Sequence, residues 1–191
     1  MQTAADQLQL QSECARFIRS LRSVRRFAPR PIPDDVLRDV LDIARWTGSS
    51  KNTQPWELIV LRDPARLREL AACGTFAGHL AGASAGLVLV MDDDMRRLDE
   101  GRQAQNVMLA AWAYGIGSCI ATLQPEPNVQ RARDLLHVPA GRGLRTAISL
   151  GYPADERALR RSLDAGAASV PIGRKPTIEF VNWESFGRRQ P

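Results

Sequence analysis

The sequence predicts a mixed α+β domain. Segments of helical and of strand character are interleaved along the chain, but they do not form the regular strand–helix units of a doubly wound sheet. One apolar run, Leu87–Met91, is nearly continuous, as is typical of a central strand buried on both faces. The 191 residues, 44% of them hydrophobic, suffice for one large core, so we expect a single domain over residues 1–191.

Each element is predicted from the spacing of its apolar side chains. Strands rich in β-branched and other apolar residues are expected over 56–61, 87–91, 118–123 and 144–150. Helices are expected over about 7–21, 34–44, 65–72, 101–113 and 127–136. Asp34 is expected to cap the second helix, and 101–113 to be the longest and most buried. Residues 154–170, rich in Ala, Gly and Arg, are expected to form a mobile loop before order returns in 171–190.

Composition excludes several classes of protein. The net charge is +5, but the basic residues are spread from Arg16 to Arg189, which does not indicate a nucleic-acid-binding tract. Cys14, Cys73 and Cys119 lie far apart without a CxxC pair and the chain has two histidines, so we expect neither a disulfide framework nor a metal site. Each cysteine is expected to be a small buried residue. The N-terminus does not resemble a signal peptide and no apolar stretch approaches membrane-spanning length, so we expect a cytoplasmic protein.

Two short motifs flank the helix expected over 34–44. The first, residues 22–27 (RSVRRF), offers guanidinium groups and a serine hydroxyl, which suit a phosphate. The second, residues 49–56 (SSKNTQPW), carries Asn52 and Gln54, whose amides both donate and accept hydrogen bonds, as the edge of a flavin ring does. Together they predict a site for flavin mononucleotide (FMN).

The glycine pattern at residues 115–117 does not indicate a dinucleotide-binding domain. Ile120 stands where the third glycine of that pattern belongs, and a predicted helix precedes the pattern where a strand is required. We therefore expect any nicotinamide cofactor to bind transiently over the flavin.

Four segments, in order, resemble signatures of the nitroreductase family of flavin enzymes. Residues 22–27 are similar to its RSxRxF element and residues 49–56 to its SxxNxQPW element. Residues 105–117 (QNVMLAAWAYGIG) resemble its central QNxxLAAxxxGxG helix, and 150–153 (LGYP) with 173–176 (GRKP) resemble its closing elements. The resemblance implies a mainly antiparallel central sheet flanked by helices, in an intertwined homodimer that builds each FMN site from both protomers.

The resemblance also implies roles for individual residues. Arg22, Ser23 and Arg174 would hold the phosphate, and Lys175 could replace a family arginine at the position of Leu21. Arg25 would lie near the pyrimidine end of the ring, where a cation stabilises the negative charge of reduced flavin. The remaining expected contacts come from the second motif, partly of the partner subunit, and from backbone groups after the central helix: Ser49, Ser50, Asn52, Gln54, Ala121 and Thr122. No side-chain acid or base and no metal ligand is expected, and for His79 a structural role is favoured over contact with the flavin.

The implied activity is transfer of electrons from NAD(P)H to a nitroaromatic, a quinone or a similar acceptor by a ping-pong flavin mechanism. Three alternatives stay open. One is a specialised family member that fragments flavin or oxidises heterocycles, a second is a flavin-binding or flavin-sensing protein without fast turnover, and a third is a basic nucleic-acid-binding protein. Residues 117–122 lack the Glu-Gly pair of classical bacterial members. The segments expected to shape the substrate pocket, 74–82 and 154–170, are variable loops in the family, so the acceptor is left open.

Overall fold

A computed structural model describes residues 4–155 and 174–189. The chain divides after Asp155 into two compact units. Most of the loop expected over 154–170 lies outside the described residues.

The first unit is built around a four-stranded sheet. Its strands are β1 (Trp56–Leu61), β2 (Ala85–Met91), β3 (Gly117–Thr122) and β4 (Gly143–Gly151). Their order is β1-β2-β4-β3 and all neighbours are antiparallel, so β1 and β3 form the two edges. All seven residues of β2 are buried, as expected for a central strand.

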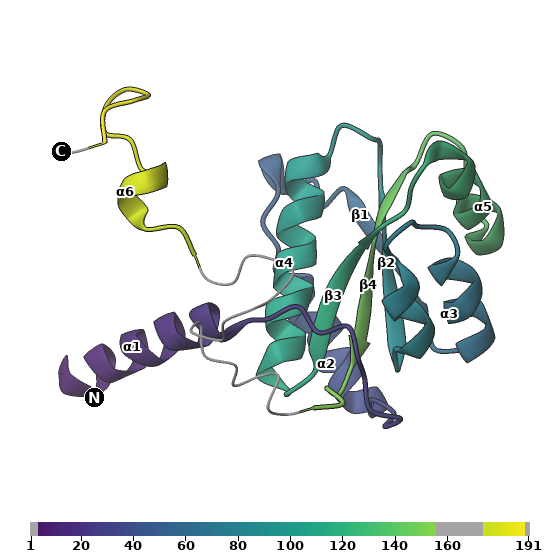
Figure 1. Cartoon of the computed structure of the whole chain (residues 1–191), viewed down its shortest axis with the longest axis horizontal. Helices are drawn as coiled ribbons and strands as arrows, with labels where there is room; N and C mark the ends of the chain where they lie inside the picture. Colours follow the sequence, from purple (N-terminus) through teal and green to yellow (C-terminus); the bar gives the residue numbers. More distant parts are fainter. Residues whose placement is uncertain (1–3, 156–173, 190–191) are drawn as a thin grey trace. The chain divides into compact units, whose positions relative to one another are not determined.

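Helices cover both faces of this sheet, as Figure 1 shows for α4 on one side and α3 and α5 on the other. The helices are α1 (Ala4–Ser20), α2 (Asp34–Ala44), α3 (Pro64–Ala71), α4 (Arg97–Ala113) and α5 (Glu126–Leu136), with short 3-10 turns η1 (Ser50–Asn52) and η2 (Gly78–Gly82). One core packs α2 and α4 against Leu87, Leu89 and Ile148 of the sheet. The other packs α3, η2 and α5 against the opposite face. The predicted α+β class and mainly antiparallel sheet are therefore confirmed.

Three expectations about individual elements need correction. Pro33, not Asp34, occupies the N-cap of α2, and Asp34 lies in the first turn, where its carboxylate pairs with Arg62. Helix α4 begins at Arg97, ahead of the predicted position 101, and its 17 residues equal the length of α1. Cys14, which lies on α1, is exposed, whereas Cys73 and Cys119 are buried as expected.

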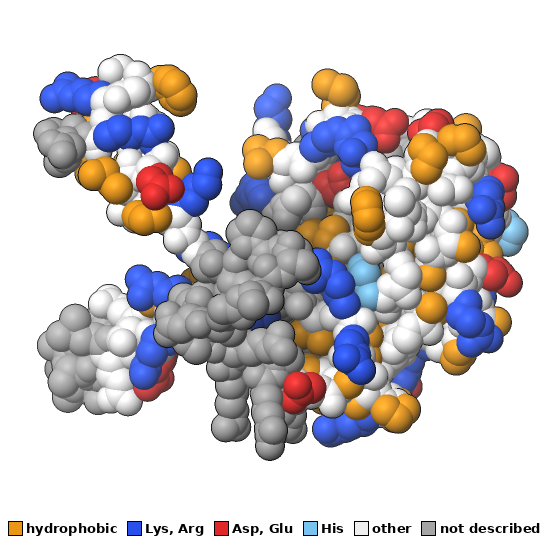
Figure 2. All heavy atoms as spheres, viewed as in Figure 1, with side chains coloured by type: hydrophobic (Ala, Val, Ile, Leu, Met, Phe, Trp, Pro, Cys, Tyr) orange, Lys and Arg blue, Asp and Glu red, His pale blue; other side chains and the backbone are white. Residues whose placement is uncertain are grey.

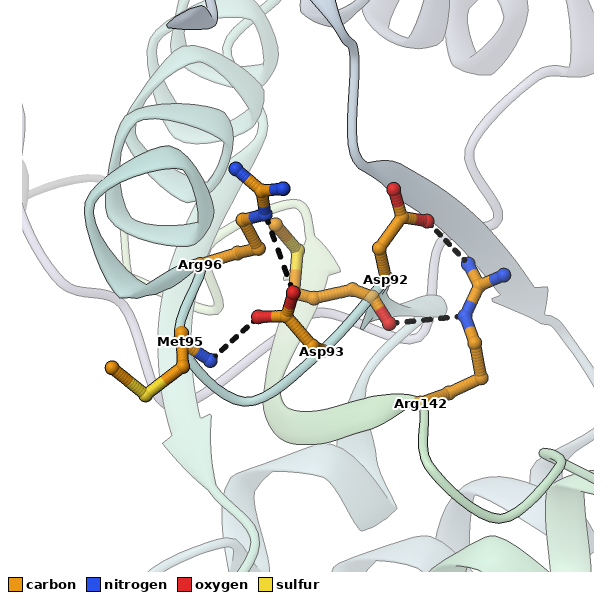
Figure 3. Close-up of polar contacts among 6 residues, drawn as sticks. Asp92, Asp93, Met95, Arg96 and Arg142 are labelled. Carbon is orange, nitrogen blue, oxygen red and sulfur yellow. Dashed lines mark hydrogen bonds and ion pairs between the residues drawn. The ribbon is translucent and has the colours of Figure 1, made fainter.

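The turn from β2 into α4 is held by ionic groups (Figure 3). Arg142 donates from Nε to the carbonyl of Met91 at 3.0 Å, and its Nη2 lies 3.5 Å from Asp92 Oδ1. Asp93 accepts from the backbone N–H of Met95 at 2.8 Å. These contacts fix the start of α4 against the end of β2.

The described part of the second unit contains one short helix, α6 (Thr177–Phe180). Four large apolar side chains of this part are exposed in the single chain: Ile178, Phe180, Trp183 and Phe186. The backbone N–H of Trp183 donates to the carbonyl of Arg188 at 2.7 Å, which closes a turn after the helix.

The described residues can also be searched for basic tracts, membrane-spanning helices and metal-ligating clusters. In the first unit, the Lys and Arg side chains visible in Figure 2 are scattered and do not form one continuous tract. Among the helices of the described residues, none is both long and apolar enough to cross a membrane. Within the same residues, no cluster of His, Cys, Asp and Glu side chains could hold a metal ion.

Candidate functional site

The first motif lies against the start of edge strand β3. Ser23 forms a parallel bridge with Ser118, and the N–H of Val24 donates to the carbonyl of Ser118 at 2.8 Å. Gly117 permits this approach, because a Cβ at that position would lie only 2.6 Å from the Cβ of Val24. The glycine before Ser118 thus brings Ser23 and its neighbours onto the sheet edge.

The same segment is anchored a second time beyond the end of β4. Phe27 bridges Pro153, and the N–H of Ala28 donates to the carbonyl of Tyr152 at 2.7 Å. The guanidinium of Arg30 stacks over the Tyr152 ring at 3.7 Å from its centroid, a cation–π contact. Arg25 lies in the sequence between the Ser23 and Val24 contacts and those of Phe27 and Ala28, and its side chain is exposed.

Between two bridges, the outer edge of β3 pairs with no strand of the described residues, and we call it the open edge. One bridge is Ser23 with Ser118, and the other joins Gly74 to Gln124, whose N–H donates to the carbonyl of Cys73 at 3.2 Å. Backbone groups alternate in direction along a strand, so those of Ile120 and Thr122 point to the same side as those of Ser118, away from β4. A row of backbone donors and acceptors at a sheet edge can pair with a planar ligand that carries complementary groups.

A polar cluster lies beside this edge, on the face of the sheet that η2 covers. The Nδ1 atom of His79 lies 2.7 Å from Ser149 Oγ, and that hydroxyl is 3.3 Å from the carbonyl oxygen of Cys119. Burial raises the pKa of the Cys119 thiol, which the nearby charge of Arg25 and hydrogen bonds with Ser23 and Arg25 partly oppose. Burial, followed by the charge of Arg25, lowers the pKa of His79, and a hydrogen bond with the Ile120 backbone acts in the opposite direction.

The second motif forms a tight turn with unusual backbone angles. The N–H of Gln54 donates to Ser49 Oγ at 2.8 Å and the N–H of Asn52 donates to the Ser49 carbonyl at 3.1 Å. Lys51, Asn52 and Gln54 have φ angles of 52°, 54° and 48° in the left-handed region. Three such non-glycine residues within four positions indicate a conformation held at a cost, as is common at ligand-binding loops. The side chains of Ser50, Asn52 and Gln54 are exposed.

The chain leading into this turn packs on α4. Asn106 donates from Nδ2 to Thr47 Oγ1 at 2.8 Å, and an added Cβ at Gly48 would lie 2.6 Å from the Arg102 guanidinium. A hollow of about 480 Å³ lies here between the residues after α2 and one face of α4. Trp46 and Leu98 line it with side chains that are 73% and 77% exposed. This exposed apolar surface adjoins the second motif.

Within one chain the two motifs lie at opposite corners of the sheet. The second motif leads into Trp56, which pairs with Met91 on edge strand β1. The first motif joins Ser118 on the other edge strand, at the end where β2 begins and β4 finishes. Three strand spacings, about 14 Å, separate the edges, and the motifs also lie at opposite ends of the strands. A single chain therefore does not bring them into one site.

The structure places the other expected residues as follows. Ala121 is buried in the core beside α3 and α5, whereas Thr122 is half-buried at the end of β3. Arg22 donates from Nη1 to the carbonyls of Arg19 and Leu21 at 2.7 and 2.9 Å, and so occupies the C-terminal end of α1.

Arg174 and Lys175 are exposed in the second unit. The contact of His79 with Ser149 is not evident from the sequence, because 70 positions separate the two residues.

Comparison with known proteins gives the family. The model of the nitroreductase family matches residues 18–102. A candidate NADH dehydrogenase/NAD(P)H nitroreductase of Archaeoglobus fulgidus is 35% identical over 153 residues, which covers 76% of this chain and 88% of the relative. The chain belongs to the nitroreductase family. An NADH dehydrogenase of Thermus thermophilus, 31% identical over 85% of this chain and 91% of its own length, is a second relative.

Solved structures of the nitroreductase family share the fold. An FMN-dependent nitroreductase from Clostridium difficile superposes with a TM-score of 0.75 at 23% identity, covering 89% of this chain and 98% of its own. A candidate nitroreductase from Desulfovibrio desulfuricans, solved in complex with FMN, gives a TM-score of 0.69 at 27% identity, with 90% and 96% covered. The family and fold predicted from the four motifs are confirmed.

Proposed function

We propose that this nitroreductase-family chain is an FMN-dependent oxidoreductase that takes electrons from NAD(P)H and passes them to a nitroaromatic, a quinone or a similar acceptor. The observation that carries this proposal is the open β3 edge beside Ser23 and Arg25, which offers backbone polar groups and a cation to a planar, electron-accepting ring. The relatives support it, because their names include NADH dehydrogenase and NAD(P)H nitroreductase, and one neighbour was solved with FMN.

The described residues fit FMN in type and position. Backbone groups of Ile120 and Thr122 face away from β4, with the Ile120 backbone also hydrogen-bonded to His79, and Ser23 and Arg25 lie beside them. Arg22 joins the phosphate-binding group only if its guanidinium leaves the carbonyls at the end of α1. Arg174 and Lys175 are proposed as further phosphate ligands from the family resemblance alone.

FMN, when bound, supplies the electron-transfer chemistry. The protein binds and orients it, and the fixed charge of Arg25 favours negative charge at the neighbouring ring edge. The donor and the acceptor would occupy the same open face in turn, which gives a ping-pong order.

A homodimer would complete the site. Because the two motifs occupy opposite corners of one sheet, Ser49, Ser50, Asn52 and Gln54 would serve the site of the partner subunit. The exposed Trp46 and Leu98 next to that motif give the partner an apolar surface to cover. The left-handed turn would then hold its polar side chains outward, toward the other protomer.

The visible spectrum of the purified protein tests the proposal. We expect flavin absorbance from the protein as isolated or after addition of FMN, and anaerobic bleaching by NADH or NADPH. Oxidation by a nitroaromatic or a quinone should then restore the absorbance. Bound flavin that neither nucleotide bleaches would instead favour a flavin-binding protein without turnover, and a protein that binds no FMN would refute the proposal.

A further inference from the structure

His79 is linked to the sheet edge by two hydrogen-bond contacts in series. Its Nδ1 atom lies 2.7 Å from Ser149 Oγ, which in turn is 3.3 Å from the carbonyl oxygen of Cys119. Ser149 is fully buried, and Cys119 is its register partner on β3. These contacts hold the imidazole against the edge of β3, close enough to Arg25 for its charge to affect the pKa of His79.

The serine hydroxyl can satisfy the imidazole in both of its protonation states. A hydroxyl has one proton to donate and also accepts hydrogen bonds. When His79 is neutral with a bare Nδ1, Ser149 can donate to Nδ1. When His79 is charged, Nδ1–H donates to Ser149 Oγ, and the hydroxyl proton turns to the carbonyl of Cys119. Neither state leaves Nδ1 unsatisfied, so this contact permits proton uptake without a rearrangement of the backbone.

Electrostatics then decide which state is populated. The groups that act on the ring are Arg25 from the first motif and the Ile120 backbone of β3, with Ser149 of β4 in contact. Cys119 adds no charge at neutral pH, because burial raises the pKa of its thiol. Arg25 therefore supplies the repulsion, and burial, followed by this charge, lowers the pKa of His79 and so favours the neutral ring.

Negative charge beside Arg25 would remove that repulsion. We propose that His79 is a proton-accepting positioning residue, which takes up a proton from solvent when negative charge is placed beside Arg25 and so stabilises the reduced cofactor. The inference rests on the proposed function for the source of that charge. Two electrons enter the cofactor from the nicotinamide donor, and the additional proton comes from water and resides on the imidazole. By reciprocity, the proton and the added charge stabilise each other by the same free energy.

The first test needs no cofactor. Imidazole signals of the apo protein are followed by NMR over a pH range, with His137→Asn as the matched variant that leaves His79 as the sole histidine. Asn suits that position because His137 has a φ of 55°, where Asn is well tolerated. We expect the pKa of His79 to lie below its ordinary value, to rise in Arg25→Gln and to stay unchanged in Arg26→Gln. An unchanged His79 pKa in Arg25→Gln would overturn the inference and leave the proposed function standing.

The second test uses the FMN-loaded protein. The midpoint potential is measured against pH in the wild type and in His79→Gln. Over the pH range in which His79 gains a proton on reduction, the midpoint potential of the wild type should fall more steeply with pH than that of His79→Gln, by about 30 mV per pH unit. This corresponds to one extra proton, a tenfold change in the equilibrium, per two electrons. Equal slopes in the two proteins would overturn the inference.

A further variant keeps the inference testable if His79→Gln misfolds. Ser149→Ala keeps the imidazole but removes the hydroxyl that accepts from its charged form. We expect a further fall in the pKa of His79 and a smaller proton uptake, because a hydrogen bond to a charged group is the stronger one. A Ser149→Ala protein with the wild-type His79 pKa would contradict the proposed role of the Ser149 hydroxyl in stabilising the charged imidazole. Failure of the wild type to bind FMN would refute the proposed function, and the reduction step of the inference with it.

Discussion

At the scale of single residues, Gly117 determines how closely the first motif approaches the sheet. A methyl group there would meet Val24 at 2.6 Å, well inside normal carbon–carbon contact, and Val24 is itself buried. Relief requires movement of residues 22–27, because the strand backbone at Gly117 is fixed by its pairing with Gly151. The position of Ser23 and Arg25 therefore depends on the absence of one side chain.

We expect Gly117→Ala to destabilise the protein by about 1–3 kcal/mol through overpacking and to weaken FMN binding together with it. Urea unfolding and FMN titration measure the two effects. Gly82→Ala is the matched control, since an added Cβ there meets nothing within 4 Å. A Gly117→Ala protein as stable as this control would show that the first motif is not seated as described.

Arg25 is the cation in the polar cluster with Cys119 and His79. Replacing it with Gln removes the charge while keeping a hydrogen-bond donor, and a hydrogen bond to a charged group contributes about 1.5–3 kcal/mol. We therefore expect Arg25→Gln to weaken FMN binding by roughly tenfold to a hundredfold and to slow its reduction. Arg26→Gln is the control, because it alters the net charge equally. Equal flavin affinity in the two variants would remove Arg25 from the site.

At the scale of elements, the second motif owes its shape to its backbone. Lys51 has a φ of 52° without being glycine or asparagine. A β-branched side chain is disfavoured in that region, so Lys51→Val should destabilise the protein by about 1–2 kcal/mol. Thr53→Val is the control, because Thr53 has an ordinary φ of −71°. Thermal unfolding of both variants checks the difference, and equal melting temperatures would argue against the left-handed turn.

The elements themselves could be predicted because local burial patterns specify them. The strand expected over 56–61 is β1 residue for residue, and the fully apolar run at 87–91 lies within β2. The turn at 51–54 could not be predicted in the same way, because no glycine marks its left-handed residues. The contact of His79 with Ser149 could not be predicted either, because it depends on how η2 lies over β4. The order β1-β2-β4-β3, which separates the two motifs, depends on long-range pairing that local patterns do not encode.

At the scale of the whole molecule, the separation of the two motifs leads us to expect that cofactor binding depends on the association of two protomers. If Ser50 and Asn52 serve the partner's cofactor, a protomer alone holds FMN with one motif only. Association would also cover the apolar side chains beside the second motif, of which Trp46 and Leu98 are largely exposed in the single chain. Loss of the dimer should then remove cofactor binding without unfolding the chain.

Leu98→Asp tests this dependence. A carboxylate in the hollow beside Trp46 would have to lose its hydration when a partner covers it, which costs several kcal/mol. We expect light scattering to show a shift from dimer to monomer at micromolar concentration, and FMN affinity to fall in parallel. Ala140→Asp is the control, since it adds the same charge at an exposed position in the loop after α5. A Leu98→Asp monomer that still binds FMN with wild-type affinity would show that one chain suffices, and it would overturn the assignment of the second motif to the partner's site.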